Sequence, residues 1–206
     1  MNVIEIKQLT KDYGNKKGVF DLDISVKKGE VFGFLGPNGA GKTTTIRHLM
    51  GFIHPNKGEC FINGLNCSKQ ADIIQKSLGY LPGEIAFMDD MGGLQFIKFI
   101  AEMKGIKDFN LAENLIDMFK LDPSGKIKKM SKGMKQKIGI VCAFMHNPDI
   151  LILDEPTSGL DPLIKINFLS LFYQKKKKVK QFLCLHIILK RLNEPVIVQQ
   201  LSRKVI

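Results

Sequence analysis

The chain has 206 residues, of which 44% are hydrophobic. This length fits one globular domain with room for an inserted lobe, and the hydrophobic share excludes a disordered chain. The net charge of +11 at first suggests a nucleic-acid or anionic membrane partner. However, residues 174–206 hold nine basic residues and one acidic residue, so +8 of the charge belongs to the tail. No nucleic-acid partner is therefore expected.

Targeting segments and metal-binding cysteines are not predicted. No run approaches the roughly 18 consecutive apolar residues that a membrane-spanning helix needs. The N-terminus alternates polar and apolar residues, unlike a secretion signal, and this predicts a cytosolic chain. The four cysteines lack the spacing of a metal or redox site, so they are interpreted as reduced core or surface thiols.

The first part of the chain predicts strands and then a glycine-rich loop. Residues 3–6 alternate like a half-buried strand, and residues 18–26 give a second short strand pattern. Residues 31–35 are a nearly all-apolar run, suited to a strand buried on both faces. The glycine-rich segment 36–43 follows, and a helix is predicted over 43–50.

The next part of the chain predicts a helical lobe and another buried strand. Between about residues 84 and 135, apolar residues recur at helical spacing. Residues 150–153 are a second fully apolar run, which ends in Asp154 and Glu155. The sequence therefore predicts an α/β fold whose helical lobe is inserted between two apolar strands of a parallel core.

The segment from Gly36 to Thr43 matches the phosphate-loop pattern G-x-x-x-x-G-K-[ST], between a predicted strand and a predicted helix. Glycines let the backbone curl so that amide N–H groups point at phosphate oxygens, and the helix start adds its positive dipole end. Lys42 is expected to neutralise the β- and γ-phosphates, and the Thr43 hydroxyl to bind Mg²⁺. The predicted ATP-binding residues of this segment are Gly36, Pro37, Asn38, Gly39, Ala40, Gly41, Lys42, Thr43 and Thr44.

Two carboxylates follow the second apolar strand. Asp154 is predicted to hold the metal, directly or through water, and Glu155 to orient or deprotonate the attacking water. Acidic residues end many strands, so the pair alone is weak evidence. It becomes informative because a phosphate loop lies upstream in the same chain.

Residues 1–162 resemble the nucleotide-binding subunit of an ABC transporter, most of all the exporter branch for drugs, peptides and lipids. The signature segment Ser131–Gln136 reads S-K-G-M-K-Q. It stands where the family has LSGGQ, and it keeps Ser131 and Gly133. The resemblance implies that this segment contacts the nucleotide of a second subunit, in a head-to-tail dimer around two ATP molecules. From the residues alone, a helix N-terminus capped by Ser131 is a compatible reading.

The resemblance assigns further residues. Tyr13 is expected to stack on adenine. Asp161 ends the segment Ser158–Asp161, which resembles the D-loop that couples the two sites. Residues 79–84 resemble the Q-loop, but Gly83 stands where the family usually has a metal-binding glutamine. The implied fold is a P-loop NTPase core of RecA-like type, with an N-terminal antiparallel β subdomain and an inserted α-helical lobe.

The tail departs from the family pattern after Gln174, which sets an ATPase domain at 1–173 and an aberrant basic tail at 174–206. Its lysine run implies adenine-rich coding sequence, in which a one-base slip is easy. The reading frame can be shifted by building each codon from the last base of one residue's codon and the first two bases of the next. From Lys178 onward, the shifted codons permit the sequence G-K-T-I-L-M-S-S-H-N-L-Q-E-V-E-R-T-C-D-R. Because this is close to the family pattern, we hypothesise a frameshifted tail. There His186 falls in register with the family's switch histidine, which contacts the γ-phosphate.

The sequence thus predicts an ATP-binding and ATP-hydrolysing subunit, with Mg²⁺, that drives a membrane exporter. The expected partners are a membrane-spanning permease and a second ATP-binding subunit, and the expected location is the inner face of the cell membrane. One alternative is a truncated, inactive relic of such a subunit. Another is a soluble ABC ATPase acting on ribosomes or DNA, although those usually carry two cassettes or long coiled-coil insertions. A GTPase or small-molecule kinase is disfavoured because no N-K-x-D guanine motif is present.

Overall fold

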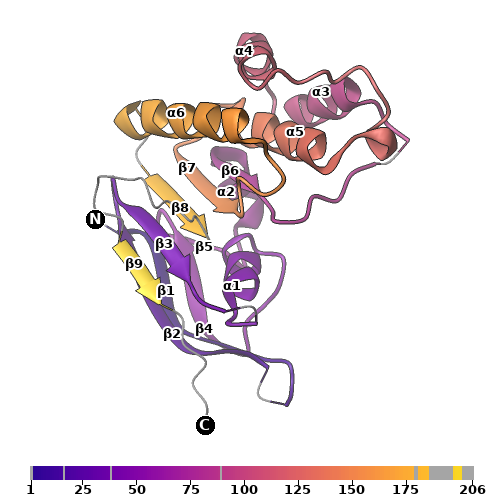
Figure 1. Ribbon diagram of the computed structural model, residues 1–206. Helices are drawn as coiled ribbons and strands as arrows, with labels where there is room; N and C mark the ends of the chain where they lie inside the picture. The colour runs from indigo at the N-terminus through magenta and orange to yellow at the C-terminus, as the bar shows by residue number, and fades with distance from the viewer. Residues whose placement is uncertain are drawn as a thin grey trace. The chain divides into compact units, whose positions relative to one another are not determined.

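The structure is a computed structural model that describes residues 2–15, 17–37, 39–88, 90–178, 181–185 and 197–200. The chain divides into two compact units, the first made of Met1–Leu78 with Lys180–Ile206 and the second of Gly79–Val179. The ribbon in Figure 1 labels the helices and strands of each unit. The predicted ATP-binding and carboxylate residues are divided between these units.

An antiparallel sheet with strand order β2-β1-β4-β5 forms one layer of the first unit. Its strands are β1 (Asn2–Asp12), β2 (Gly18–Lys27), β4 (Lys57–Ile62) and β5 (Leu65–Asn66). The central strand β1 pairs antiparallel with both β2 and β4. Alternating apolar residues such as Ile4, Ile6 and Ile24 are buried, which is the period-2 pattern of a sheet with one covered face.

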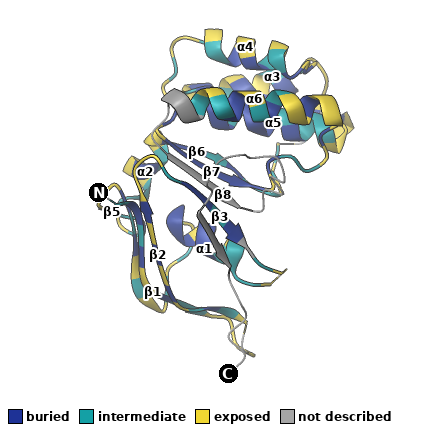
Figure 2. Ribbon diagram, turned by 60° about the vertical axis from the view of Figure 1, so that its left-hand side comes forward, coloured by how far each residue is buried: buried dark blue, intermediate teal, exposed yellow. Residues whose placement is uncertain are grey.

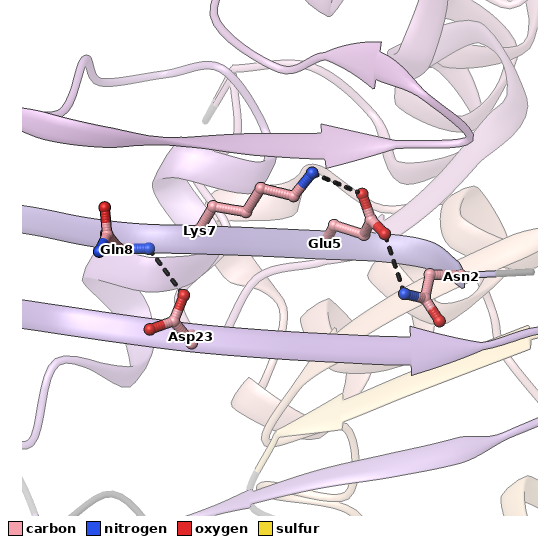
Figure 3. A network of polar contacts seen from close by, with 5 residues as sticks. All are labelled: Asn2, Glu5, Lys7, Gln8 and Asp23. Atoms are coloured by element: carbon pink, nitrogen blue, oxygen red, sulfur yellow. Dashed lines mark hydrogen bonds and ion pairs between the residues drawn. The ribbon is translucent and has the colours of Figure 1, made fainter.

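A β-bulge at Gln8 interrupts this alternation in β1. The register of β1 against β2 shifts between Ile6 and Leu9, and both residues are buried. Gln8 has a φ of 48°, and its backbone N–H donates to the Asp23 carboxylate at 2.9 Å (Figure 3). The neighbouring strand approaches so closely that a Cβ on Gly58 would lie 2.3 Å from the Gln8 carbonyl oxygen. The bulge therefore keeps Leu9 in the core and requires glycine on β4.

A small polar network lies beside the bulge (Figure 3). Glu5 accepts a hydrogen bond from the Asn2 amide at 2.9 Å and pairs with Lys7 at 3.3 Å. These contacts, that of Asn2 foremost, lower the pKa of the Glu5 carboxyl. Because Lys7 is exposed and Glu5 is only partly buried, the network adds little to stability.

The parallel strands of the first unit lead directly to the phosphate loop. Strand β3 (Val31–Leu35) pairs in parallel with β8 (Gln181–Leu185) on one side and with β9 (Ile197–Gln200) on the other. Helix α1 (Lys42–Leu49) follows the loop and contacts β2 and β4. Its Ile46 and Leu49 are buried, and α2 (Ala71–Ser77) follows β5 later in the chain. The loop is thus held between a central strand and a packed helix.

A buried histidine in α1 gives the first testable prediction. The His48 side chain is 1% exposed, Nδ1 bonds the Thr44 carbonyl at 2.8 Å, and burial lowers the pKa of the ring. The native state therefore binds this proton less readily than the unfolded state, so stability present above about pH 6.5 is lost as pH falls. Urea titrations from pH 7.5 to 5.5 measure how the free energy of unfolding depends on pH. His48→Gln should reduce the slope of this dependence by at most about 1.4 kcal/mol per pH unit. Parallel slopes for variant and wild type would contradict this.

The second unit combines a buried strand with a group of helices. Strand β6 (Leu78–Leu81) neighbours β7 (Ile150–Asp154), whose five residues are all buried (Figure 2). The helices are α3 (Gly93–Met103), α4 (Asn110–Met118), the short 3-10 helix η1 (Ile127–Lys129), α5 (Lys132–Phe144) and α6 (Pro162–Lys178). Helix α5 contacts both α3 and α4, and Phe144 packs edge-on against Phe168 of α6 with ring centres 6.2 Å apart. Across the described part of the chain, no helix combines the length and apolarity needed to cross a membrane.

Candidate functional site

The phosphate loop of the first unit is organised around Lys42. Its Nζ donates to the carbonyl oxygens of Gly36 at 2.6 Å and Pro37 at 3.1 Å, so the ammonium folds back over the loop. Helix α1 has no acidic residue in its first turn, and its first amides have no partner within the helix. The Lys42 ammonium and the N-terminus of α1 are therefore both available to bind an anion where the sequence predicts phosphate.

Backbone conformation in the loop depends on glycine. Gly39 and Gly41 have φ values of 82° and 90°, in the left-handed region that other residues avoid. A Cβ on Gly41 would also lie 2.5 Å from a methyl carbon of Val19. Both conformation and close packing thus exclude a side chain at Gly41, directly before the first helical residue.

Tyr13 directly follows β1 in the same unit. Its side chain is 54% exposed, too much for a residue held mainly by core packing. The Lys11 ammonium lies 5.7 Å from the ring centre, a cation–π distance. The ring is accessible to a planar ligand, as stacking on adenine would require.

In the second unit, Asp154 ends the buried strand β7 and is itself only 8% exposed. The Q-loop glycine packs against it, since a Cβ on Gly83 would lie 3.3 Å from the Asp154 Cγ and Oδ2 atoms. The absence of a side chain at position 83 thus lets the loop backbone approach this carboxylate. An oxygen ligand at the end of a buried strand suits Mg²⁺, which binds one or two carboxylates together with substrate phosphates.

Glu155 stands in a strained turn directly after Asp154. Its φ of 46° places a non-glycine residue in the left-handed region, at a cost of about 1–3 kcal/mol. Two hydrogen bonds hold its carbonyl oxygen: the Ser158 amide donates at 3.0 Å and the Gln136 side-chain amide at 3.4 Å. The Gln136 amide also donates to the Pro156 carbonyl at 3.1 Å. The exposed Glu155 side chain therefore projects from a turn that is tied to α5.

The signature segment packs closely on the D-loop. Ser131 is the N-cap of α5, and its Oγ accepts from the Met134 amide at 3.2 Å. A Cβ on Gly133 would lie 2.8 Å from the Gly159 carbonyl oxygen, so only glycine fits there. The Lys132 side chain in turn covers Gly159. The helix start that carries Ser131 and the D-loop thus form one packed surface.

Removing the Ser131 cap gives a second testable prediction. Ser131→Ala should lower the free energy of unfolding by about 1 kcal/mol, because the Met134 amide loses its acceptor. Urea denaturation measures this change. Ser170→Ala is the matched control, since Ser170 is an exposed residue within α6, where alanine is the better helix former. Equal losses in both variants would contradict a capping role.

Asp161 has a structural role that the sequence did not indicate. Its Oδ1 accepts from the Ile164 amide at 2.9 Å, so it caps the start of α6. One oxygen is thereby committed to the helix while the residue itself stays exposed. An exposed, oriented carboxyl group is compatible with a contact to a second subunit.

The structure gathers the predicted residues into two groups. Tyr13 and the described loop residues from Gly36 to Thr44 belong to the first unit. Ser131, Gly133, Asp154, Glu155 and Asp161 belong to the second unit, where contacts connect the signature helix with the turn and the D-loop. Asn38 and His186 lie outside the described residues.

Gln136 is the residue that sequence reasoning missed. It lies within the signature segment, and neither the sequence pattern nor the resemblance assigns it a role. A glutamine in the first turns of a helix is usually a surface residue, yet Gln136 is 4% exposed. Gln136 lies four residues before the apolar Ile140, on the same face of the helix, so the spacing could have predicted that it is buried. The spacing could not have predicted which carbonyl groups it binds.

Comparison with known proteins finds related sequences. The sequence profile described as ABC transporter matches residues 19–158. The bacitracin transport ATP-binding protein BcrA of Bacillus licheniformis is 38% identical over 190 residues, which are 90% of this chain. The chain spans 62% of that relative's length.

Solved structures agree with the fold. A structure of an ATP-binding subunit of an ABC transporter is 30% identical, with a TM-score of 0.85 over 98% of this chain and 86% of its own. The dimeric structure of MJ0796, a bacterial ABC transporter cassette, is 22% identical, with a TM-score of 0.81 over 96% of this chain and 94% of its own. The predicted fold class is confirmed: an α/β P-loop NTPase core with an antiparallel β subdomain and a helical lobe.

Proposed function

The chain belongs to the ABC transporter family, and on this premise we propose that it binds and hydrolyses ATP to drive a membrane exporter. The observation that carries the proposal is the Asp154–Glu155 turn, in a chain that also has a phosphate loop covered by Lys42. A bacitracin transport protein among the relatives supports an exporter of the drug or peptide class.

The proposed mechanism assigns each group one task. Lys42 and the first amides of α1 hold the β- and γ-phosphates, while Tyr13 stacks on adenine. Glu155 accepts a proton from the attacking water, or orients that water toward the γ-phosphate. The dimer closes around ATP and opens after hydrolysis, and these two movements change the conformation of the permease.

Mg²⁺ fits the residues that we propose for it. Thr43 offers a hydroxyl and Asp154 a carboxylate, both hard oxygen ligands, and substrate phosphates and waters would complete the coordination. When bound, the ion supplies neutralisation of charge on the transferring phosphoryl group. Among the described residues, no group of three or more His, Cys, Asp or Glu side chains is placed to hold a metal ion.

Charge at the signature helix supports a second ATP-binding subunit as partner. Lys132 and Lys135 lie in the first turn of α5, where the helix dipole disfavours cations. A phosphate from a partner's nucleotide would offset this repulsion. We therefore propose a dimer in which Ser131 and Gly133 contact the partner's ATP and Asp161 lies at the contact between the subunits.

Phosphate release from ATP by the purified chain tests the proposal. We expect Mg²⁺-dependent turnover of ATP, together with binding of a fluorescent ATP analogue. Binding without turnover would favour the inactive relic. Turnover stimulated by RNA or ribosomes, and not by a co-expressed permease, would favour a soluble ABC ATPase.

A third prediction concerns Gly83. A Cβ at this position would require the Asp154 carboxylate to give way by a few tenths of an ångström. Because that carboxylate is a proposed metal ligand, Gly83→Ala should raise the Mg²⁺ concentration for half-maximal turnover by about 10-fold. Gly125→Ala is the matched control, because a Cβ there meets only Met130 at 3.9 Å. A Mg²⁺ titration of phosphate release measures both. An unchanged requirement in Gly83→Ala would show that the close approach does not matter for the metal.

We also propose the boundaries of an ATPase domain at 1–173, with a helical lobe at about 84–135 and an aberrant basic tail at 174–206. The frameshift hypothesis makes the tail from about residue 178 an out-of-frame translation. Sequencing the gene tests this: a lysine tract without an extra base would overturn it. Substitution of His186 in an active chain would test its assignment as the switch histidine.

The permease and the location at the membrane form the last part of the proposal. A neighbouring gene for a membrane protein with six spanning helices would identify the partner. On co-expression, the chain should sediment with the cell membrane, and without the permease it should remain in the supernatant. Sedimentation independent of the permease would contradict the proposed peripheral attachment.

A further inference from the structure

We propose that Gln136 is a positioning residue for Glu155, so that the signature helix holds the turn from which water is activated. The inference rests on the proposed function of Glu155. It adds a connection within one subunit between the helix start assigned to a partner's nucleotide and the carboxylate assigned to the chain's own nucleotide.

The Gln136 side chain is buried, so its hydrogen-bond partners must lie within the protein. It is 4% exposed, and a buried amide must find hydrogen-bond partners inside the protein. Its Nε2 finds two carbonyl oxygens, those of Glu155 at 3.4 Å and Pro156 at 3.1 Å. Both belong to the turn directly after β7. A single side chain thus fixes the direction of two successive peptide groups.

The turn needs such support because its conformation is costly. Glu155 has a φ of 46°, and the only other described bond to its carbonyl comes from the Ser158 amide at 3.0 Å. Without the Gln136 donor, the strained residue can relax toward negative φ, which would reorient the Glu155 side chain. A carboxylate displaced by about 1 Å can lose up to about 100-fold in rate.

The first measurement separates positioning from general stability. Gln136→Met keeps the shape of the side chain and removes the donor, so kcat should fall about 10- to 100-fold while KM for ATP stays within about twofold. Asn167→Leu is the matched control, since the Asn167 side-chain amide donates to the Met118 carbonyl at 2.7 Å in the same unit. An unchanged kcat in Gln136→Met, or an equal fall in Asn167→Leu, would overturn the proposal.

A second measurement does not depend on turnover. Hydrogen exchange at the Ser158 amide reports the turn directly, because this amide donates to the Glu155 carbonyl. In the full chain, Gln136→Met should accelerate this exchange about 10-fold or more, and Asn167→Leu should leave it unchanged. Should the wild type fail to hydrolyse ATP, the proposed function fails while this exchange still decides the role of Gln136. Equal exchange in wild type and Gln136→Met would refute it.

Discussion

Replacing Glu155 by glutamine is expected to reduce ATP turnover by about 10²- to 10⁴-fold, the usual contribution of a general base. Glutamine keeps the size and hydrogen-bonding shape of the side chain but cannot accept a proton from water. The strained turn should persist, because Gln136 and Ser158 bind the backbone carbonyl of residue 155 and not its side chain. ATP binding should therefore remain within about twofold of the wild type.

Two readouts separate loss of chemistry from loss of binding in this variant. Phosphate release gives kcat, and a fluorescent ATP analogue gives the dissociation constant. Because hydrolysis precedes opening in the proposed cycle, Glu155→Gln should also accumulate an ATP-bound dimer on size exclusion. Glu113→Gln is the control, since it makes the same substitution on helix α4 and not in the turn after β7. Undiminished turnover in Glu155→Gln would assign the base elsewhere.

The phosphate loop could be predicted from sequence because its geometry is local. Lys42 lies six residues after Gly36, and the same short segment supplies the strand end, the glycines and the helix start. The predicted strand at 31–35 and the helix at 43–50 agree with β3 and α1 to within one residue. The apolar run 150–153 agrees equally well with β7.

The contacts within the second unit could not be predicted in this way. The bond from Gln136 to Pro156 joins residues 20 apart, and no periodicity of the sequence encodes it. Nor does a sequence pattern indicate a positive φ at Glu155, since glutamate disfavours that region and tertiary contacts impose it. For Gly83, sequence indicated only a missing glutamine, and the approach to Asp154 needed coordinates.

A bulge explains why the first predicted strand was too short. Alternation ends at Ile6 in the sequence, so a strand was expected over 3–6. The structure continues β1 to Asp12, because the bulge at Gln8 resets the register and returns Leu9 to the buried face. The bulge leaves Gln8 out of the strand ladder, and its backbone amide donates instead to the Asp23 carboxylate on β2. A local window of sequence does not show that contact.

Lys42→Ala is expected to weaken ATP binding by about 30- to 150-fold, which corresponds to about 2–3 kcal/mol for charge-assisted hydrogen bonds to phosphate. In the structure the Lys42 ammonium already lies over the loop, bound to the Gly36 and Pro37 carbonyls. It therefore needs only to exchange these oxygens for phosphate oxygens. Stability should change little, because these carbonyls lie in a partly exposed loop and can bind water instead.

Nucleotides with different numbers of phosphate groups make the Lys42 prediction specific. If Lys42 binds the β- and γ-phosphates, Lys42→Ala should weaken ATP binding strongly and leave the weak binding of AMP unchanged. Lys42→Arg should recover only part of the affinity, because a planar guanidinium does not replace a compact ammonium at this loop. Lys57→Ala on β4 is the control for loss of a surface charge. Titration with fluorescent ATP, competed by AMP, measures each constant. An equal loss for AMP and ATP would mean that Lys42 supports the fold of the loop and does not bind the terminal phosphates.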